Sequence, residues 1–460
     1  MFKKFIILIA IVVGLGFLMM ALGLNAHQAI SVSIFSASIL GTLFFWGFRL
    51  SFVFMGTALL FSTKTIDISH FVAYSSLEVI LFLVGMMVLV GMLKESGFFA
   101  LITQVLLGIR HLTARRFVII LCVVSWIMAA LVDEVTSIIF MIAAIFEICN
   151  RLKVNPTPYV IISVLATNIG SAATVIGNPI GILIAIKSGL TFEDFIVKAL
   201  PVSAVSLMAT IGICLLWYRK AFKEMDGSIS RLNGNEIAAI QKPLSIGRDL
   251  KVSLAIFAAT LILISLHHRL ELLWGLEPNT ILFIAPLFAS SFVFFWKRNS
   301  ARKYIEKDVE WWTLLFFLFL FGQAGTLRYT GATNVLAKHL AEMTSSSLSI
   351  LTGCILWISS IGSSILDNVV LVATIIPVIQ DFKGLSINLQ PLWWALLFGG
   401  CFGGNITLVG STANIVALGI LEKEKNLRVT FMQWFGIGLT VGIITTVIVW
   451  VVLLFTPFYH

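Results

Sequence analysis

The sequence predicts an all-α polytopic membrane protein built from two inverted repeats, with about eleven transmembrane helices and two re-entrant helical hairpins beside helices broken at the midplane. Composition gives the first reason, since 59% of the 460 residues are hydrophobic and 12% are charged, whereas soluble domains carry roughly 25% charged residues. The net charge of +9 comes from lysines and arginines that lie between apolar runs. Such placement indicates membrane topology rather than nucleic-acid binding.

The apolar runs divide the chain into four parts. Residues 1–24 are an extra N-terminal transmembrane helix, 25–218 the first repeat, 219–249 a cytoplasmic linker and 250–460 the second repeat. The expected hairpins cover about 117–149 and 351–380, and the broken helices cover about 158–186 and 391–421. The runs that flank Asp133 and Asp367 are nearer fifteen residues, whereas a span needs about 20. Re-entrant hairpins fit this length, and full spans are the alternative.

Internal repetition is the second reason. Three alignments carry it: 91–97 with 325–331 and 133–135 with 367–369, both at an offset of 234 residues, and 174–178 with 407–411 at 233. Chance similarity between apolar helices would match Leu and Val, not Gly, Asp and Thr in a fixed order. The halves are therefore predicted to be duplicates.

The charges give the orientation of the repeats. Arg110, Arg115 and Arg116 precede the first hairpin, whereas residues 344–347, at the corresponding place, carry no charge. Residues 297–307 are rich in Lys and Arg, but only Lys64 lies in the equivalent stretch of the first copy. By the positive-inside rule the two copies are inverted and the N-terminus is cytoplasmic. The expected location is a plasma or bacterial inner membrane. Inverted repeats with discontinuous helices are typical of secondary transporters, and the absence of a P-loop argues against ATP-driven transport. No enzymatic activity is expected.

The two hairpin tips are the first candidate site. Carboxylates at membrane depth cost about 2.5 to 3.5 kcal/mol each on insertion scales, so they point to a function. Oxygen donors suit sodium, and burial favours the neutral acid, which lets a carboxylate exchange protons near neutral pH. The candidate residues are Asp133, Glu134, Thr136, Ser137, Asp367 and Asn368. Glu134 is the expected titrating residue, and the structural alternative is a carboxylate that caps a helix.

The two helix breaks are the second candidate site, because half-helices direct amides toward anions and unwound carbonyls toward cations. A close-packed interface of small residues is the alternative. The candidates are Asn168, Ser171, Thr174, Gly177, Asn178, Asn405, Thr407, Gly410, Ser411, Thr412 and Asn414. Asp133, Asn178, Asp367 and Asn414 are the expected sodium ligands. No cofactor is expected beyond a coupling sodium ion or proton, since the five cysteines show no metal-binding spacing.

These motifs resemble the ion transporter superfamily, which includes arsenite permeases, citrate and divalent-anion symporters, sodium/proton antiporters and the melanosomal P protein. The similar segments are 83–97, the Asp133 tip, 168–179, 366–377 and 403–414. The resemblance implies hairpins entering from opposite faces, a transport domain that moves like an elevator against a scaffold, and often a homodimer. It also implies two half-sites, one formed by the Asp133 tip with 168–178 and the other by Asp367, Asn368 and 405–414.

Two departures from the superfamily bear on the substrate. Sodium/dicarboxylate members carry Ser-Asn-Thr at the tips, where this chain has acidic residues, and Gly181 lacks the side chain that Asn414 keeps in the second half. We therefore expect an elevator-type transporter in the lipid bilayer that exchanges sodium for protons. The alternative is sodium- or proton-coupled transport of a small anion, either a carboxylate such as citrate or an oxyanion such as arsenite.

Overall fold

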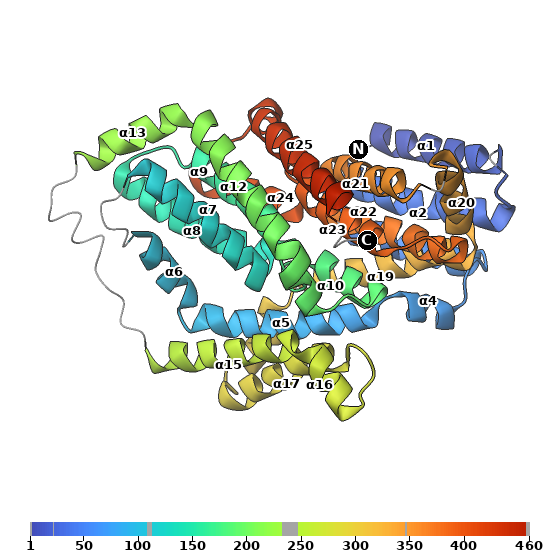
Figure 1. The fold of residues 1–460 in the computed structure, drawn as a ribbon, viewed down its shortest axis with the longest axis horizontal. Helices are drawn as coiled ribbons and strands as arrows, with labels where there is room; N and C mark the ends of the chain where they lie inside the picture. The colour runs from blue at the N-terminus through green and yellow to red at the C-terminus, as the bar shows by residue number, and fades with distance from the viewer. Residues whose placement is uncertain (1, 22, 108–112, 232–246, 346, 457–460) are drawn as a thin grey trace.

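The computed structural model describes residues 2–21, 23–107, 113–231, 247–345 and 347–456, and the regular structure of these residues is entirely helical (Figure 1). Nine of the described helices are long and apolar enough to cross a membrane, or ten if α15 and α16, which bend by 64° at their junction, count as one span. The prediction of an all-α polytopic membrane protein is confirmed. Arg110 and residues 232–246 of the expected linker lie outside the described residues.

The helices of the first half are α1 (Phe2–Ala21), α2 (Ala26–Phe44), α3 (Arg49–Ser62), α4 (Ile68–Tyr74), α5 (Leu77–Glu95), α6 (Phe98–Leu107), α7 (Ala114–Leu131), α8 (Glu134–Leu152), α9 (Thr157–Gly170), α10 (Pro179–Ser188), α11 (Phe192–Asp194) and α12 (Leu200–Trp217). Those that follow are α13 (Arg219–Ile229), α15 (Arg248–Ser265), α16 (His267–Trp274), α17 (Thr280–Trp296), α18 (Ala301–Lys303), α19 (Trp311–Tyr329), α20 (Ala332–Met343), α21 (Leu348–Ile365), α22 (Asn368–Asp381), α23 (Gln390–Gly403), α24 (Thr412–Lys425) and α25 (Phe431–Phe455).

Helix boundaries recur between the two halves at the offsets seen in the sequence. The pair α5 and α19 begins at Leu77 and Trp311, which are 234 residues apart, and ends at Glu95 and Tyr329, again 234 apart. The pairs α6 and α20, and α7 and α21, begin at the same offset. The broken helices α9–α10 and α23–α24 begin and break at an offset of 233. Equivalent residues therefore lie at equivalent places in their helices.

Each hairpin turns at a two-residue tip. Val132 and Asp133 join α7 to α8, and Leu366 and Asp367 join α21 to α22. An aspartate can end one helix and begin the next because its side chain accepts a hydrogen bond from the orphan amides of the following turn. Arms α7, α8 and α21 contain 18, 19 and 18 residues, which is longer than the apolar runs suggested. Re-entry into the membrane stays a prediction.

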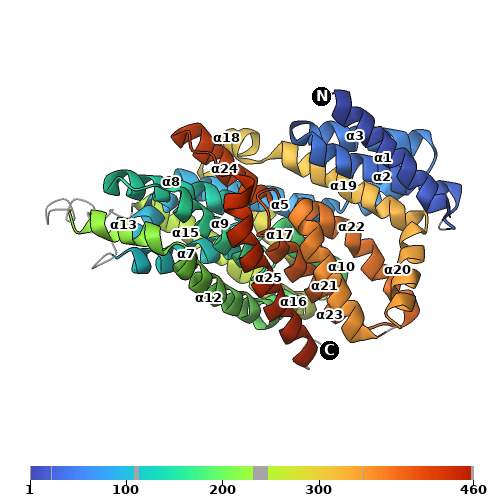
Figure 2. The ribbon, with the colours of Figure 1, turned by 90° about the horizontal axis from the view of Figure 1, so that it is seen from above.

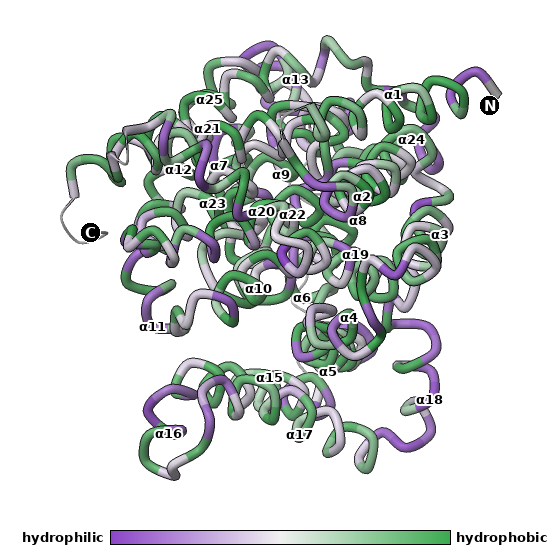
Figure 3. The backbone as a smooth tube through the Cα atoms, turned by 90° about the vertical axis from the view of Figure 1, so that its right-hand side faces the viewer, coloured by the Kyte–Doolittle hydropathy of each residue, from purple (hydrophilic) through white to green (hydrophobic). Residues whose placement is uncertain are grey.

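The helices form two groups. The hairpin bundle, α7–α12 with α21–α25, is held together by contacts of α21 with α23, α7 with α9 and α12 with α25. The framing helices, α1–α5 and α15–α19, lie along two sides of it, with α17 packed on α5 and with α3 and α4 packed on α19. Figures 1 and 2 show α7 and α8 at one end of the long axis, and α2, α19 and α20 at the other. Figure 3 shows α5, α15 and α17 as one layer of mostly hydrophobic helices, with hydrophilic stretches at α16 and α18.

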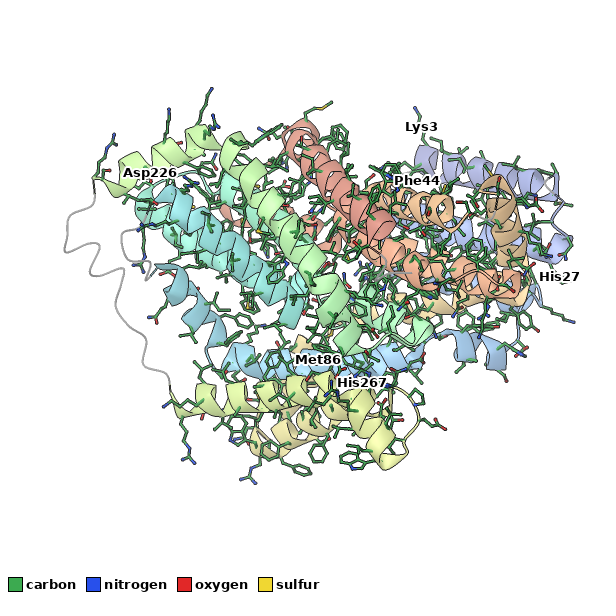
Figure 4. The ribbon with its side chains drawn as sticks, viewed as in Figure 1. Lys3, His27, Phe44, Met86, Asp226 and His267 are labelled. Carbon is green, nitrogen blue, oxygen red and sulfur yellow. The ribbon has the colours of Figure 1, made fainter. Side chains whose placement is uncertain are left out.

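Part of the expected linker is folded. Helix α13 carries Asp226, labelled at one end of the molecule in Figure 4. The Asp226 carboxylate accepts a hydrogen bond of 2.7 Å from the amide of Ala114, the first residue of α7. This segment therefore anchors the base of the first hairpin, in addition to joining the two halves.

Candidate functional site

The two hairpin tips touch each other through Glu134 and Asn368. The Asn368 side-chain amide donates to Glu134 Oε1 at 3.1 Å, and the Ser411 hydroxyl donates to the same oxygen at 3.4 Å. Glu134 is 2% exposed and Asn368 is 1% exposed. These two residues are equivalent in the repeats, 234 positions apart. The point where the halves meet therefore joins a carboxylate from one copy to a carboxamide from the other.

The neighbouring aspartates cap helices. Asp133 Oδ1 accepts from the Thr136 amide at 2.8 Å at the start of α8, and Asp367 Oδ1 accepts from the Val369 amide at 3.1 Å at the start of α22. One oxygen of each aspartate therefore caps a helix, which is the structural alternative to an ion-binding role for the tip carboxylates. The other oxygen of Asp367 accepts from the Thr412 hydroxyl at 2.5 Å. Glu134, in contrast, makes side-chain contacts between the two copies.

The chain leaves the helical path between α9 and α10 and again between α23 and α24. Asn178 begins α10 by accepting from the Gly181 amide at 2.9 Å, and Ser411 begins α24 by accepting from the Ala413 amide at 3.2 Å. Pro179 fits the first turn of α10 because it needs no amide donor there. The second break lies beside the first tip, as the Ser411 contact with Glu134 shows, and Asn178 of the first break lines one cavity with Asp133 and Glu134.

Asparagines tie the two breaks together. Asn168 Nδ2 donates to Asn405 Oδ1 and to Asn414 Oδ1, both at 2.9 Å. Asn414 in turn donates to the carbonyls of Gly404 at 2.7 Å and Thr407 at 2.9 Å. The three asparagines are fully buried. Such a network orders the unwound backbone of the second half against the first, because each buried polar group needs a partner.

Equivalent threonines fasten each break to the adjacent hairpin. The Thr174 hydroxyl donates to the Ala130 carbonyl, and the Thr407 hydroxyl donates to the Ser364 carbonyl. Gly177 and Gly410 have a steric role, since an added Cβ atom would collide with the carbonyl oxygen of Ser171 or of Ser363, respectively. These four positions therefore hold the breaks in shape.

Two remaining candidates differ in their bonding. Ser171 donates to the Asn168 carbonyl at 2.9 Å and accepts from Asn178 Nδ2 at 3.1 Å. Ser137 is buried in α8, and its hydroxyl has no hydrogen-bond partner among the described residues. A buried hydroxyl without a partner is an available ligand atom or an unmet cost.

Two cavities reach the tips. One of about 200 Å³ is lined by both tip acids of the first copy, Asp133 and Glu134, together with Thr136, Asn178 and Thr412. Lys94, Lys307 and Asp308 lie along the same cavity. A second cavity of about 370 Å³ is lined mainly by apolar side chains and contains Asp367.

The four expected sodium ligands have different surroundings, and their binding of sodium stays a prediction. Asp133 and Asn178 line the first cavity and Asp367 lines the second, whereas Asn414 is buried in the asparagine network. Within the described residues, no group of three or more His, Cys, Asp and Glu side chains has the geometry of a metal site. In the same part of the chain, no lysine or arginine forms an ion pair with Asp133, Glu134 or Asp367.

Sequence analysis missed Arg49, which is 7% exposed at the start of α3. Its guanidinium donates to the Thr313 hydroxyl at 2.8 Å and lies 4.7 Å from the centre of the Trp46 ring. Trp46 lines the second cavity together with Asp367. The signal in the sequence is an arginine inside an apolar stretch. A buried guanidinium near one tip is a cationic group of the framing helices.

Comparison with known proteins gives four findings. The family model described as citrate transporter, CitMHS, matches residues 42–399. An uncharacterized transporter of Mycobacterium tuberculosis is 31% identical over 374 residues, 81% of this chain and 84% of that protein. The human P protein is 26% identical over 449 residues, 82% of this chain and 53% of that protein. In fold, the chain resembles the crystal structure of the Alcanivorax borkumensis YdaH transporter with a TM-score of 0.55 at 15% identity, covering 86% of this chain and 88% of that one.

Proposed function

Because this chain belongs to the citrate transporter family, whose matched region includes both hairpin tips, we propose that it is a secondary active transporter that exchanges sodium for protons. The family membership fits the predicted resemblance to the ion transporter superfamily, which the P protein and YdaH likenesses also support. The coupling ions and the exchange itself are the proposed part.

The contact between Glu134 and Asn368 carries the proposal. A carboxylate at the meeting point of two duplicated halves, without a basic partner in the described part of the chain, needs a proton or a metal cation to offset its charge. The same group can bind each in turn, which is the requirement for an antiporter. Asp133 and the Asn178 carboxamide lie along the same cavity and supply further oxygen atoms for a hard cation.

The proposed movement is an elevator-type displacement of the hairpin bundle against the framing helices. Both tips and both breaks belong to the hairpin bundle, whereas Lys94, Lys307 and Asp308 of the first cavity belong to the framing helices or to their connections. By the positive-inside rule, the Lys94 side is cytoplasmic. The structure then corresponds to a state in which Glu134 faces the cytoplasm through this cavity.

A second candidate is proton- or sodium-coupled transport of a small carboxylate. The name of the family and the buried Arg49 favour it, because guanidinium groups bind carboxylates. Three tip carboxylates would repel a free anion, so the substrate would have to arrive with protons or metal cations.

The test is a sodium pulse applied to proteoliposomes that contain a pH-sensitive dye. Antiport predicts alkalinisation of the lumen, because inward sodium is exchanged for outward protons, and loss of this response in Glu134→Gln. The control is Glu306→Gln, which removes an exposed carboxylate that pairs with Arg302 within one turn. Absence of a pH response in the wild type, together with sodium- or proton-dependent uptake of labelled citrate, would replace antiport by the second candidate.

A further inference from the structure

The boundary between the hairpin bundle and the framing helices carries two pairs of symmetry-related charged residues, one basic and one acidic. Lys94 lies in the last turn of α5, and Arg328 lies in the last turn of α19. Glu147 lies on α8, and Asp381 is the last residue of α22. Both the basic pair and the acidic pair are separated by the repeat offset of 234 residues. Each half therefore offers one cation on a framing helix and one carboxylate on the returning arm of a hairpin.

Only one of these two pairs is joined. Arg328 Nε donates to Asp381 Oδ1 at 3.2 Å, and Arg328 Nη1 donates to Gln380 Oε1 at 3.0 Å. The Thr333 hydroxyl adds a bond of 2.6 Å to the other oxygen of Asp381. The Asp381 side chain is 12% exposed, so water screens this contact less than an ordinary surface pair. The framing helix α19 is thus fastened to the second hairpin.

The equivalent pair in the first half is open. Lys94 Nζ instead contacts Asp308 Oδ1 at 3.1 Å, and Glu147 contacts Arg151 on its own helix at 2.5 Å. The Lys94 and Glu147 side chains are 57% and 42% exposed, so Glu147 can exchange its partner at little cost. The Asp308 side chain is 9% exposed, so the release of Lys94 leaves a mostly buried carboxylate that the Lys94–Glu147 contact has to offset. The framing helix α5 is therefore not fastened to the first hairpin in this state.

The cavities on the two sides differ in whether they reach the hairpin tips. On the open side, the cavity that includes Lys94 reaches Asp133 and Glu134. On the joined side, the cavity of about 180 Å³ that includes Arg328 and Gln380 contains none of the tip residues. Access to the tips thus coincides with the side on which the charged pair is broken.

We infer that Arg328–Asp381 and Lys94–Glu147 are alternating clasps, one closed in each end state of the transport cycle. Displacement of the hairpin bundle breaks the first clasp, opens the Arg328 side and allows Lys94 to leave Asp308 for Glu147. Inverted repeats exchange their conformations when access alternates, so the contact made by one copy is made by the other in the opposite state. The inference rests on the proposed alternating movement, though not on which ion is carried.

A further ion pair on the joined side behaves differently. Lys187 of α10 contacts Glu78 of α5 at 3.1 Å and also links the hairpin bundle to a framing helix. The residues at the equivalent positions, Ile420 and Trp312, cannot form an ion pair. This contact therefore biases the equilibrium in one direction and has no alternating counterpart.

The test measures access to a single cysteine at Ile139, which lines the cavity on the Lys94 side, in a protein whose five native cysteines are replaced. A membrane-impermeant thiol reagent is applied to inverted and to right-side-out vesicles. Arg328→Gln is expected to lower the labelling rate from the Lys94 side by about two- to five-fold, the population change that a partly exposed ion pair sustains. Glu147→Gln is expected to leave this rate unchanged or raise it, and the exchange of charges in Arg328→Asp with Asp381→Arg is expected to restore the wild-type rate.

The matched control is Arg302→Gln, which breaks an exposed pair within one turn and should not alter labelling. A second measurement joins Lys94→Cys to Glu147→Cys with a short bifunctional thiol reagent, and the inference expects a cross-link that protects Ile139→Cys from the Lys94 side. No effect of Arg328→Gln, or a fall in labelling with Glu147→Gln as large as with Arg328→Gln, would overturn the inference. If the labelling rates change as expected but sodium/proton exchange is absent, the clasps stand and the proposed ions are wrong. If exchange is present but Arg328→Gln does not change the labelling rate, the clasps alone are refuted.

Discussion

Replacing Glu134 by Gln and by Ala separates the charge of this side chain from its hydrogen bonds. Gln keeps an oxygen that can accept from Asn368 Nδ2, which lies 3.1 Å from Glu134 Oε1 in the structure. We therefore expect the free energy of unfolding of the Gln variant to differ from that of the wild type by less than about 1 kcal/mol. Ala leaves the buried Asn368 amide without the acceptor it uses in the structure, at a cost of about 1 to 3 kcal/mol. Polar contacts in membrane proteins average about 0.6 kcal/mol, which places the Ala variant toward the lower end of this range.

Two measurements on the same samples test this reasoning. Tryptophan fluorescence during thermal unfolding in detergent should give a lower Tm for Ala than for Gln, with Gln close to wild type. The sodium pulse should give no lumenal pH change with either variant, because neither side chain can release a proton. A Glu134→Gln protein that still exchanges sodium for protons would show that Glu134 is not the titrating group. Equal Tm values for Ala and Gln would show that the tip contact does not stabilise the fold.

The remaining predictions concern stability and the shape of the breaks. Asp133→Ala and Asp367→Ala should each lower the free energy of unfolding by about 0.5 to 2 kcal/mol, because each loses a helix cap. The corresponding Asn variants should keep their stability, since Asn also caps helices. Thermal unfolding compares the variants, and equal losses for Ala and Asn would contradict the capping role. Gly170→Ala and Gly403→Ala should each cost about 1 to 3 kcal/mol, because the added Cβ would collide with the carbonyls of Trp126 and Ser360; an unchanged Tm would show that α9 and α23 can move away from α7 and α21 freely. Asn168→Ala and Asn414→Ala should show coupling in a double-mutant cycle of Tm, since they share a hydrogen bond, and additive effects would refute the network.

The sequence was a good guide to equivalence and a poor guide to contact. The offsets aligned Asp133 with Asp367 and Thr174 with Thr407 in the sequence, and the helix boundaries recur at those offsets. An offset states which residues correspond, but it carries no information about which corresponding residues touch. Glu134 and Asn368 touch because they lie where the two copies meet, and this follows only from how the halves pack.

Local hydrogen bonds explain why the sodium ligands proposed from sequence have different surroundings. Asp133 and Asp367 each give one oxygen to the amides of the helix that follows, and Asn414 gives its amide to unwound carbonyls. A short polar side chain beside a helix start satisfies the nearest orphan amide first. Arg49 escaped notice for the opposite reason, because its importance comes from burial against Thr313 and Trp46, which are distant or unremarkable in the sequence.

The difference between the two copies at their meeting point has a chemical reason. Two carboxylates at the positions of Glu134 and Asn368 would face each other about 3 Å apart, and like charges that close cannot both ionise. Two carboxamides would hydrogen-bond to each other and leave no ionisable group at these two positions. A carboxylate against a carboxamide keeps one ionisable group while giving it a donor from the opposite copy. In the proposed function, duplication supplies the symmetric frame for alternating access, and the departure from symmetry at this one pair supplies the site at which a proton and a cation would compete.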